Sequence, residues 1–272
     1  MKIKERFKQV TMKEWPTEKG DEWITWMLEH IGDVDPELRD GCIYPAFGEL
    51  IHKDRLQNHQ KNRILESCMS RSHLFYRLGE HEGDGVFTRS FSALVIAEIV
   101  KHEQGWERGQ YERVLNSCVE YLDKEQDVRG YVENKGWAHS IAHGADLLVA
   151  LVEHSQFRKD DATLFLQAIR GAFWKEDVFT DDEEERLSFV IEALLKRDVA
   201  ISTVTKWVKE TFLSLESLWN DAPFSISAFR IRTNVLHFMK ALFFRVDMPD
   251  LQRTIKQYLE EWHKRVYQNL EN

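Results

Sequence analysis

The 272-residue chain has little glycine and little proline, with 13 and 5 residues respectively. Tight turns rely on these two residues, so their scarcity argues against an all-β protein built from many short hairpins. Cysteine is also scarce: Cys42, Cys68 and Cys118 are far apart and do not follow a metal-binding spacing. We therefore expect reduced thiols that act as small core residues, and a cytoplasmic protein.

Long apolar runs and basic clusters are missing as well. The best apolar run, residues 93–99, contains Glu98 and falls well short of the ~18 residues that a membrane-spanning helix needs. Lysine and arginine number 37 against 46 aspartate and glutamate residues, and no basic run offsets the resulting net charge of −9. Because nucleic-acid affinity depends on neutralising phosphates with basic groups, we expect neither a nucleic-acid partner nor a membrane.

Apolar residues recur along the chain at the three- and four-residue intervals of amphipathic helices. The segment 86–100 is apolar nearly all round, which is typical of a helix buried on most sides. The most regular stripes occupy residues 204–219, 235–246 and 251–266. From about eleven such segments with short loops we predict an all-α fold, an α-solenoid-like (HEAT-like) superhelix of antiparallel pairs with a concave face. The chain 1–272 would form a single helical domain, or two packed halves that divide near residues 123–130.

Local patterns predict where some helices begin and how far they run. Thr11 and Glu14 form a capping-box pattern for a first helix, and an amphipathic pattern covers residues 58–78. The acidic run TDDEEE at 180–185 has the composition of a cation site. A capping box that begins at Thr180 explains it more simply, because carboxylates in the first turn stabilise the positive end of a helix.

Several segments together carry a family likeness. They are Leu38-Arg39-Asp40 with Tyr44, FTRSFSAL at 87–94, RGYVE at 129–133, GWAHSIAHGADLL at 136–148, and Asn234 with ALFFR at 241–245. With these segments the chain resembles the bacterial family called domain of unknown function 2785, and residues 136–148 are the most specific part. The resemblance implies a cytoplasmic, all-helical protein with HEAT-like packing. It implies no reaction and no catalytic residue.

The stretch 137–153 is the main candidate for a functional site, because it places several polar residues on one predicted helix. On a helical wheel His139, His143 and Asp146 fall within an arc of about 60°, while Trp137 lies on the opposite, inward side. A His-x-x-x-His spacing lets two imidazoles converge on one metal, and a carboxylate one turn later can orient an imidazole or be a third ligand. The alternatives are a solvated helix face, with Asp146 paired to His143, or imidazoles that bond backbone carbonyls.

Arg89 is the second candidate, since it opens a helix that is otherwise nearly free of charge. A buried guanidinium needs a carboxylate or a ligand, and we expect an interhelical ion pair or a bond to a helix C-terminus. The carboxylates considered as partners are Glu133, Asp146, Asp40 and Glu98. Arg129 and Glu133, just before the predicted helix, form either a local pair or part of a binding site.

Signatures of common enzymes are absent from the sequence: it contains no Gly-x-Ser-x-Gly, no His-Glu-x-x-His and no Gly-x-x-x-x-Gly-Lys-Ser/Thr. We therefore predict a protein that binds a partner protein or a small polar ligand on its concave face. The candidate binding residues are Trp137, His139, His143, Asp146, Arg89, Arg129 and Glu133. The alternative is a metal-dependent, hydrolase-like enzyme with His139, His143 and Asp146 as ligands, and a third reading makes these residues an interhelical brace. We expect no cofactor other than such a divalent metal, and the sequence leaves the oligomeric state open.

Overall fold

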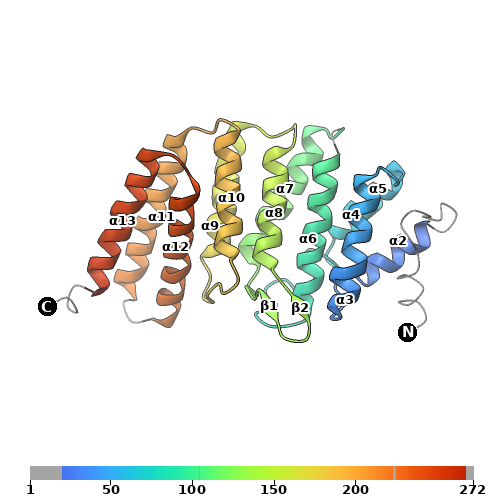
Figure 1. Cartoon of the computed structure of the whole chain (residues 1–272), viewed down its shortest axis with the longest axis horizontal. Helices are drawn as coiled ribbons and strands as arrows, with labels where there is room; N and C mark the ends of the chain where they lie inside the picture. Colours follow the sequence, from blue (N-terminus) through green and yellow to red (C-terminus); the bar gives the residue numbers. More distant parts are fainter. Residues whose placement is uncertain (1–19, 104, 223–224, 268–272) are drawn as a thin grey trace.

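The computed structural model describes residues 20–103, 105–222 and 225–267. These residues form helices and one small two-stranded sheet, which confirms the predicted all-helical class (Figure 1). The helix start predicted at Thr11 lies outside the described residues. None of the described helices is long and apolar enough to cross a membrane.

Most of the helices lie in two rows, which Figure 1 shows one behind the other. One row contains α4 (Tyr44–His52), α6 (Gly85–His102), α8 (Ser140–Glu153), α10 (Glu183–Lys196) and α12 (Ile226–Arg245), packed in that order. The other row contains α5 (Asn58–Cys68), α7 (Arg108–Lys124), α9 (Ala162–Phe173), α11 (Ile201–Asp221) and α13 (Pro249–Tyr267). The N-terminal end is formed by α2 (Gly20–Glu29), α3 (Pro36–Leu38) and the π-helical turn η3 (Arg39–Ile43), and a 3₁₀ turn, η4 (Lys159–Asp161), precedes α9.

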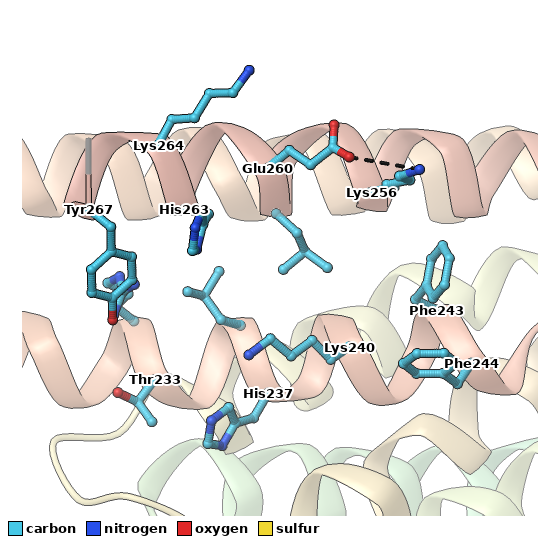
Figure 2. A pocket seen from close by; sticks show the side chains of 13 residues that line it. Thr233, His237, Lys240, Phe243, Phe244, Lys256, Glu260, His263, Lys264 and Tyr267 are labelled. Atoms are coloured by element: carbon cyan, nitrogen blue, oxygen red, sulfur yellow. Dashed lines mark ion pairs between the residues drawn. The ribbon is translucent and has the colours of Figure 1, made fainter. Parts of the chain in front are cut away.

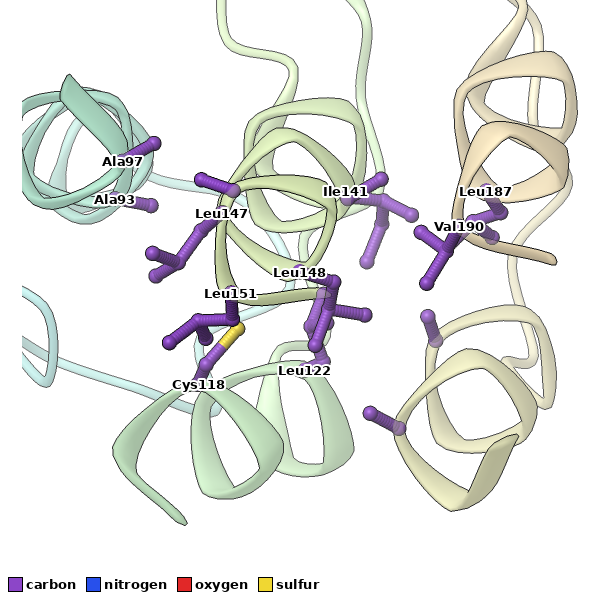
Figure 3. Packing of buried hydrophobic residues seen from close by; sticks show 14 of the residues in the cluster. Ala93, Ala97, Cys118, Leu122, Ile141, Leu147, Leu148, Leu151, Leu187 and Val190 are labelled. Atoms are coloured by element: carbon purple, nitrogen blue, oxygen red, sulfur yellow. The ribbon is translucent and has the colours of Figure 1, made fainter. Parts of the chain in front are cut away.

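The hydrophobic core is continuous from α2 to α13 and fills the space between the rows. Figure 3 shows its central part, where Leu147 of α8 points toward α6, Leu151 toward Cys118 of α7, and Ile141 toward α10. Each fully buried side chain of this size contributes ~1.5–3 kcal/mol to the free energy of folding. Gly144 lets α8 approach α7, because a Cβ there would lie 2.5 Å from Cδ2 of Leu122. These contacts hold α8 firmly at the centre of the molecule.

Helix α6 is buried nearly all round, as the sequence predicts, because α4, α5 and α8 surround it. Other predictions of helix extent are wrong. The helix expected over 58–78 ends at Cys68, and turns occupy residues 70–79. The helix expected from Trp137 begins only at Ser140. Whether the chain folds as one unit or as two halves stays a prediction.

Candidate functional site

A short β-hairpin joins α7 to α8, in the place where the sequence predicts the start of a helix. Its strands, β1 (Tyr131–Val132) and β2 (Gly136–Trp137), pair antiparallel with Tyr131 opposite Trp137. Gly136 has a φ of +78°, and a Cβ there would lie 2.8 Å from Cβ of Pro36. Only glycine therefore allows the hairpin to lie this close to α3 without strain.

Arg39 holds the hairpin against η3. Its side chain has no exposed surface, and its Nη2 donates to the carbonyl oxygens of Lys135 at 2.7 Å and Trp137 at 3.4 Å. Its Nε donates to the Oδ1 of Asp40 at 2.8 Å, and its guanidinium lies 4.2 Å from the ring centroid of Phe87. Burial raises the pKa of the Asp40 carboxyl, and the charge of Arg39 opposes that rise. No sequence pattern indicates this role of Arg39, because the bonded carbonyls lie 96 and 98 positions further along the chain.

Three aromatic rings form a surface on the hairpin, which we call the hairpin platform: Tyr131, Trp137 and His139. The rings of Trp137 and His139 are parallel, with centroids 4.4 Å apart, and Tyr131 meets Trp137 edge-on at 5.0 Å. Trp137 is 43% exposed and Tyr131 is 55% exposed. The prediction that Trp137 turns inward is therefore wrong, because this residue belongs to a strand and not to α8.

His139 precedes α8 in a left-handed conformation, with a φ of +47°, and so does not continue the helix. Its Nδ1 lies 3.2 Å from the Oε1 of Glu183, the first residue of α10, whose side chain is fully buried. The other oxygen of Glu183 accepts from the backbone N–H of Asp181 at 3.1 Å. His139 is thus fixed by α10, which the helical wheel could not indicate.

The acidic run before α10 also holds the hairpin. The Oδ2 of Asp181 accepts from the backbone N–H of Tyr131 at 3.1 Å and from the hydroxyl of Thr180 at 2.8 Å. A Cβ at Gly130 would lie 2.3 Å from Asp181, so glycine is required at this crossing. The acidic run marks the start of a helix, as predicted, because α10 begins at Glu183. The predicted cap is wrong, since Asp182 and not Thr180 precedes the helix.

His143 is 9% exposed and lies in the core between α8 and α6. Its ring meets Phe91 edge-on at 5.2 Å and lies 5.7 Å from the ring of His139. Burial lowers the pKa of His143 well below its ordinary value, and electrostatic interactions with His139 and Arg186 lower it further. A backbone hydrogen bond at Ser90 acts in the opposite direction. Within the described residues its Nδ1 has no hydrogen-bond partner, so this buried nitrogen is left unpaired.

Asp146 pairs with Arg186 of α10, and not with His143 as the sequence suggested. Both side chains line a small cavity of about 290 Å³ between α6, α8 and α10. Burial raises the pKa of the Asp146 carboxyl, and the hydrogen bond and charge of Arg186 oppose that rise. In the described ranges no three His, Cys, Asp or Glu side chains are placed to hold a metal ion together.

Arg89 lies apart from these residues and forms a buried ion pair with Glu125. Its Nε and Nη2 donate to the two carboxylate oxygens at 2.6 and 2.7 Å, and its Nη1 donates to the carbonyl of Tyr76 at 2.9 Å. Glu125 also accepts from the backbone N–H groups of Gln126 and Asp127. An ion pair was expected for Arg89, but all four suggested partners were wrong, since Glu125 was not among them.

Arg129 and Glu133 are separated by the first strand of the hairpin. Arg129 pairs with Asp127, with Nε 2.8 Å from Oδ1, and its Nη2 donates to the carbonyl of Gly83 at 2.8 Å. Glu133 is exposed in the turn of the hairpin. The suggested pair between Arg129 and Glu133 is therefore wrong, and Arg129 instead ties the hairpin to the segment before α6.

Fold and site together define an all-helical protein that carries an exposed aromatic surface on a hairpin between two of its central helices. The chain belongs to the family described as protein of unknown function (DUF2785), whose model matches residues 74–244. The match includes the platform, Glu183 and the Arg89–Glu125 pair, and it leaves out Arg39. No curated protein matches the chain, and no solved structure does.

Proposed function

We propose that the chain is a binding protein whose hairpin platform holds a positively charged segment of a partner protein. The observation that supports this most is Trp137, which is 43% exposed although its ring lies parallel to His139 at 4.4 Å. A large aromatic side chain that is rigidly held and partly in water is typical of the anchors at protein interfaces. Tyr131, 55% exposed, extends the same surface.

The charges around the platform favour a cationic ligand. Asp40 and Asp84 keep 30% and 52% of their side-chain surface exposed, and Glu133 is exposed as well. Two cations lie nearby, and each is matched by one of these carboxylates: Arg39, which has no exposed surface, pairs with Asp40, and Lys135 pairs with Asp84. The exposed carboxylate of Glu133 therefore leaves the local charge balance acidic. A lysine or arginine over an aromatic ring gains ~0.5–2 kcal/mol, and neighbouring carboxylates add to this attraction. A basic segment therefore complements both the rings and the charge.

The platform lies at the N-terminal end of α8, the middle helix of the row from α4 to α12 (Figure 1). In our proposal this row lines the concave face of an α-solenoid-like (HEAT-like) superhelix, the architecture that proteins of this kind use to offer extended binding surfaces. We place the protein in the cytoplasm, and the three free thiols, Cys42, Cys68 and Cys118, support this location.

A metal-dependent, hydrolase-like enzyme is the alternative, with His139, His143 and Asp146 as ligands. The unused Nδ1 of His143, 5.7 Å from His139 between ring centroids, favours it. Against it, Glu183 already contacts the Nδ1 of His139, and Arg186 binds Asp146. A small polar ligand in place of a protein would use the same residues. The binding proposal also explains why the rings of Tyr131 and Trp137 are exposed, so we prefer it.

Two fluorescent peptides test the proposal: one rich in lysine and arginine, and one of equal length with glutamate at those positions. We expect the wild-type protein to prefer the basic peptide at physiological salt, and Trp137→Ala to weaken that binding by about tenfold. Leu213→Ala, at a residue that is 58% exposed on α11, is the matched control and should bind like the wild type. Equal affinity for both peptides, or unchanged affinity in Trp137→Ala, would overturn the proposal.

A further inference from the structure

Helix α12 is the last helix of its row in the described chain. Helices α6, α8 and α10 each pack against a neighbour on both sides within the row, whereas α12 packs against α10 on one side only. On its other side, α12 and α13 run next to each other and enclose an open groove of about 980 Å³ (Figure 2). The groove thus occupies the place where one more helix would continue the row.

The floor of the groove is apolar. Leu236 and Leu259 are among its lining residues. Phe243 and Phe244 lie at one end of it (Figure 2). Phe244 is 84% exposed, the largest exposure among the large hydrophobic residues of the described chain. An aromatic side chain this exposed beside other apolar groups is typical of a surface that a partner covers.

The rim of the groove is basic, although the chain as a whole has a net charge of −9. Four cationic side chains line the groove, Arg232, Lys240, Lys256 and Lys264, against the single carboxylate of Glu260. Glu260 lies 3.8 Å from Lys256, so it neutralises one of the four. Figure 2 shows Lys240 reaching into the space between the two helices. The local charge therefore favours an acidic occupant.

Arg232 supplies an independent indication that an anion belongs here. It is 9% exposed, and its guanidinium carbon lies 5.9 and 6.0 Å from the ring centroids of Trp219 and Trp262. Its Nε is buried and has no hydrogen-bond partner among the described residues. No carboxylate pairs with this guanidinium among the described residues, so an acidic group of a ligand in the groove would supply the partner that the charge of Arg232 lacks.

We propose that the groove between α12 and α13 binds an acidic amphipathic helix of a partner protein. The lining residues extend along α12 from Arg232 to Phe244, about 18 Å at the rise of an α-helix, which is room for three helical turns. Apolar side chains of the partner pack on Leu236, Leu259 and Phe244, and its carboxylates pair with the lysines of the rim. The bound helix packs beside α12 as α10 does on the other side.

Binding of designed peptides to the full chain, followed by fluorescence anisotropy, tests this proposal. The probe is a labelled helix of about 14 residues with leucine at positions i, i+3, i+4 and i+7 and glutamate elsewhere. Its controls are a scrambled sequence of the same composition and a version with lysine in place of glutamate. We expect only the acidic amphipathic peptide to bind tightly.

Variants locate the site. The double variant Lys240→Glu/Lys264→Glu should lower the affinity for the acidic peptide by about tenfold or more, and so should the single variant Phe244→Ala. Lys53→Glu/Lys124→Glu, directly after α4 and at the end of α7, carries the same change of charge and should bind like the wild type. Trp137→Ala should also bind normally, which separates this site from the hairpin platform.

Three outcomes would overturn the proposal. The first is equal binding of the scrambled peptide, and the second is full binding by Lys240→Glu/Lys264→Glu. The third is groove-dependent binding of phosphatidylglycerol vesicles without any binding of the acidic peptide, which would assign the groove to a membrane surface instead.

Discussion

Arg89 and Glu125 meet through two hydrogen bonds, of 2.6 and 2.7 Å, and neither side chain has any exposed surface. The pair joins α6 to the end of α7 directly ahead of the hairpin. A buried charge that loses its partner is costly, because neither water nor another group replaces the lost interaction.

We predict that Arg89→Met lowers the free energy of unfolding by about 3–5 kcal/mol in urea denaturation. The double variant Arg89→Met/Glu125→Met should regain part of this loss, although the bonds to Tyr76 and to the amides after Glu125 stay broken. Lys124→Ala, which breaks an exposed pair with Glu120, is the control and should cost less than about 1 kcal/mol. A loss in Arg89→Met no larger than that of the control would show that the ion pair does not stabilise the fold.

Gly136 offers a test of the hairpin geometry. We predict that Gly136→Ala destabilises the protein by about 1–3 kcal/mol, because its φ of +78° strains any side chain and the new Cβ would meet Pro36 at 2.8 Å. Gly109→Ala is the matched change: Gly109 lies in α7 with open space around it, so alanine should be neutral or stabilising there. Thermal unfolding of both variants checks the prediction. Equal melting temperatures for the two variants would show that the hairpin is not held in this conformation.

His143 should make stability depend on pH. Burial lowers its pKa well below the ordinary value of 6.5, so below pH 6.5 the unfolded chain takes up a proton that the folded chain excludes. Stability is therefore lost as the pH falls from 6.5 toward the folded-state pKa, with a slope of up to ~1.4 kcal/mol per pH unit.

We predict that His143→Gln flattens the pH dependence of the free energy of unfolding between pH 7 and 5, whatever its stability at pH 7. His59→Gln, at a side chain that is 62% exposed, should keep the wild-type slope. Asp146 acts in the opposite direction, because burial raises the pKa of its carboxyl and the folded chain then holds the extra proton at low pH. If His143→Gln keeps the full wild-type slope, the imidazole is not the group responsible.

Zinc tests the enzyme alternative. We predict that protein purified without a histidine tag keeps its melting temperature when Zn²⁺ is added, because Glu183 contacts His139 and Arg186 holds Asp146. The same measurement on His143→Ala and Arg186→Met completes the test. A shift in the wild type that disappears in His143→Ala would favour the metal-dependent enzyme over the binding protein.

The sequence was sufficient to predict the helical class and the almost complete burial of α6, because both follow from the spacing of apolar residues. It was not sufficient for the hairpin. Strands of two residues carry no periodicity of their own, so the wheel placed Trp137 and His139 on α8. Asn134 and Gly136, which both have positive φ, were the available turn signal.

The partners of the polar residues could not be predicted either. Glu125 is 36 positions from Arg89, and Arg186 is 40 positions from Asp146. The packing of the helices determines which carboxylate pairs with which cation across such distances. The spacing of residues along one helix does not reveal how that helix packs against others. Short-range spacing favoured a pair of Asp146 with His143 and a pair of Arg129 with Glu133. In the structure Asp146 pairs with Arg186, and Arg129 pairs with Asp127.

The bonds that hold the hairpin platform have a consequence for folding. They connect Arg39 with Lys135, Tyr131 with Asp181, and His139 with Glu183, across 96, 50 and 44 positions of the chain. Closing such long loops costs chain entropy before any contact compensates for it, so these contacts form after the local helices. A platform of this kind exists only once η3, the hairpin and α10 have all come together. The surface that we propose for binding is therefore complete only in the fully folded chain.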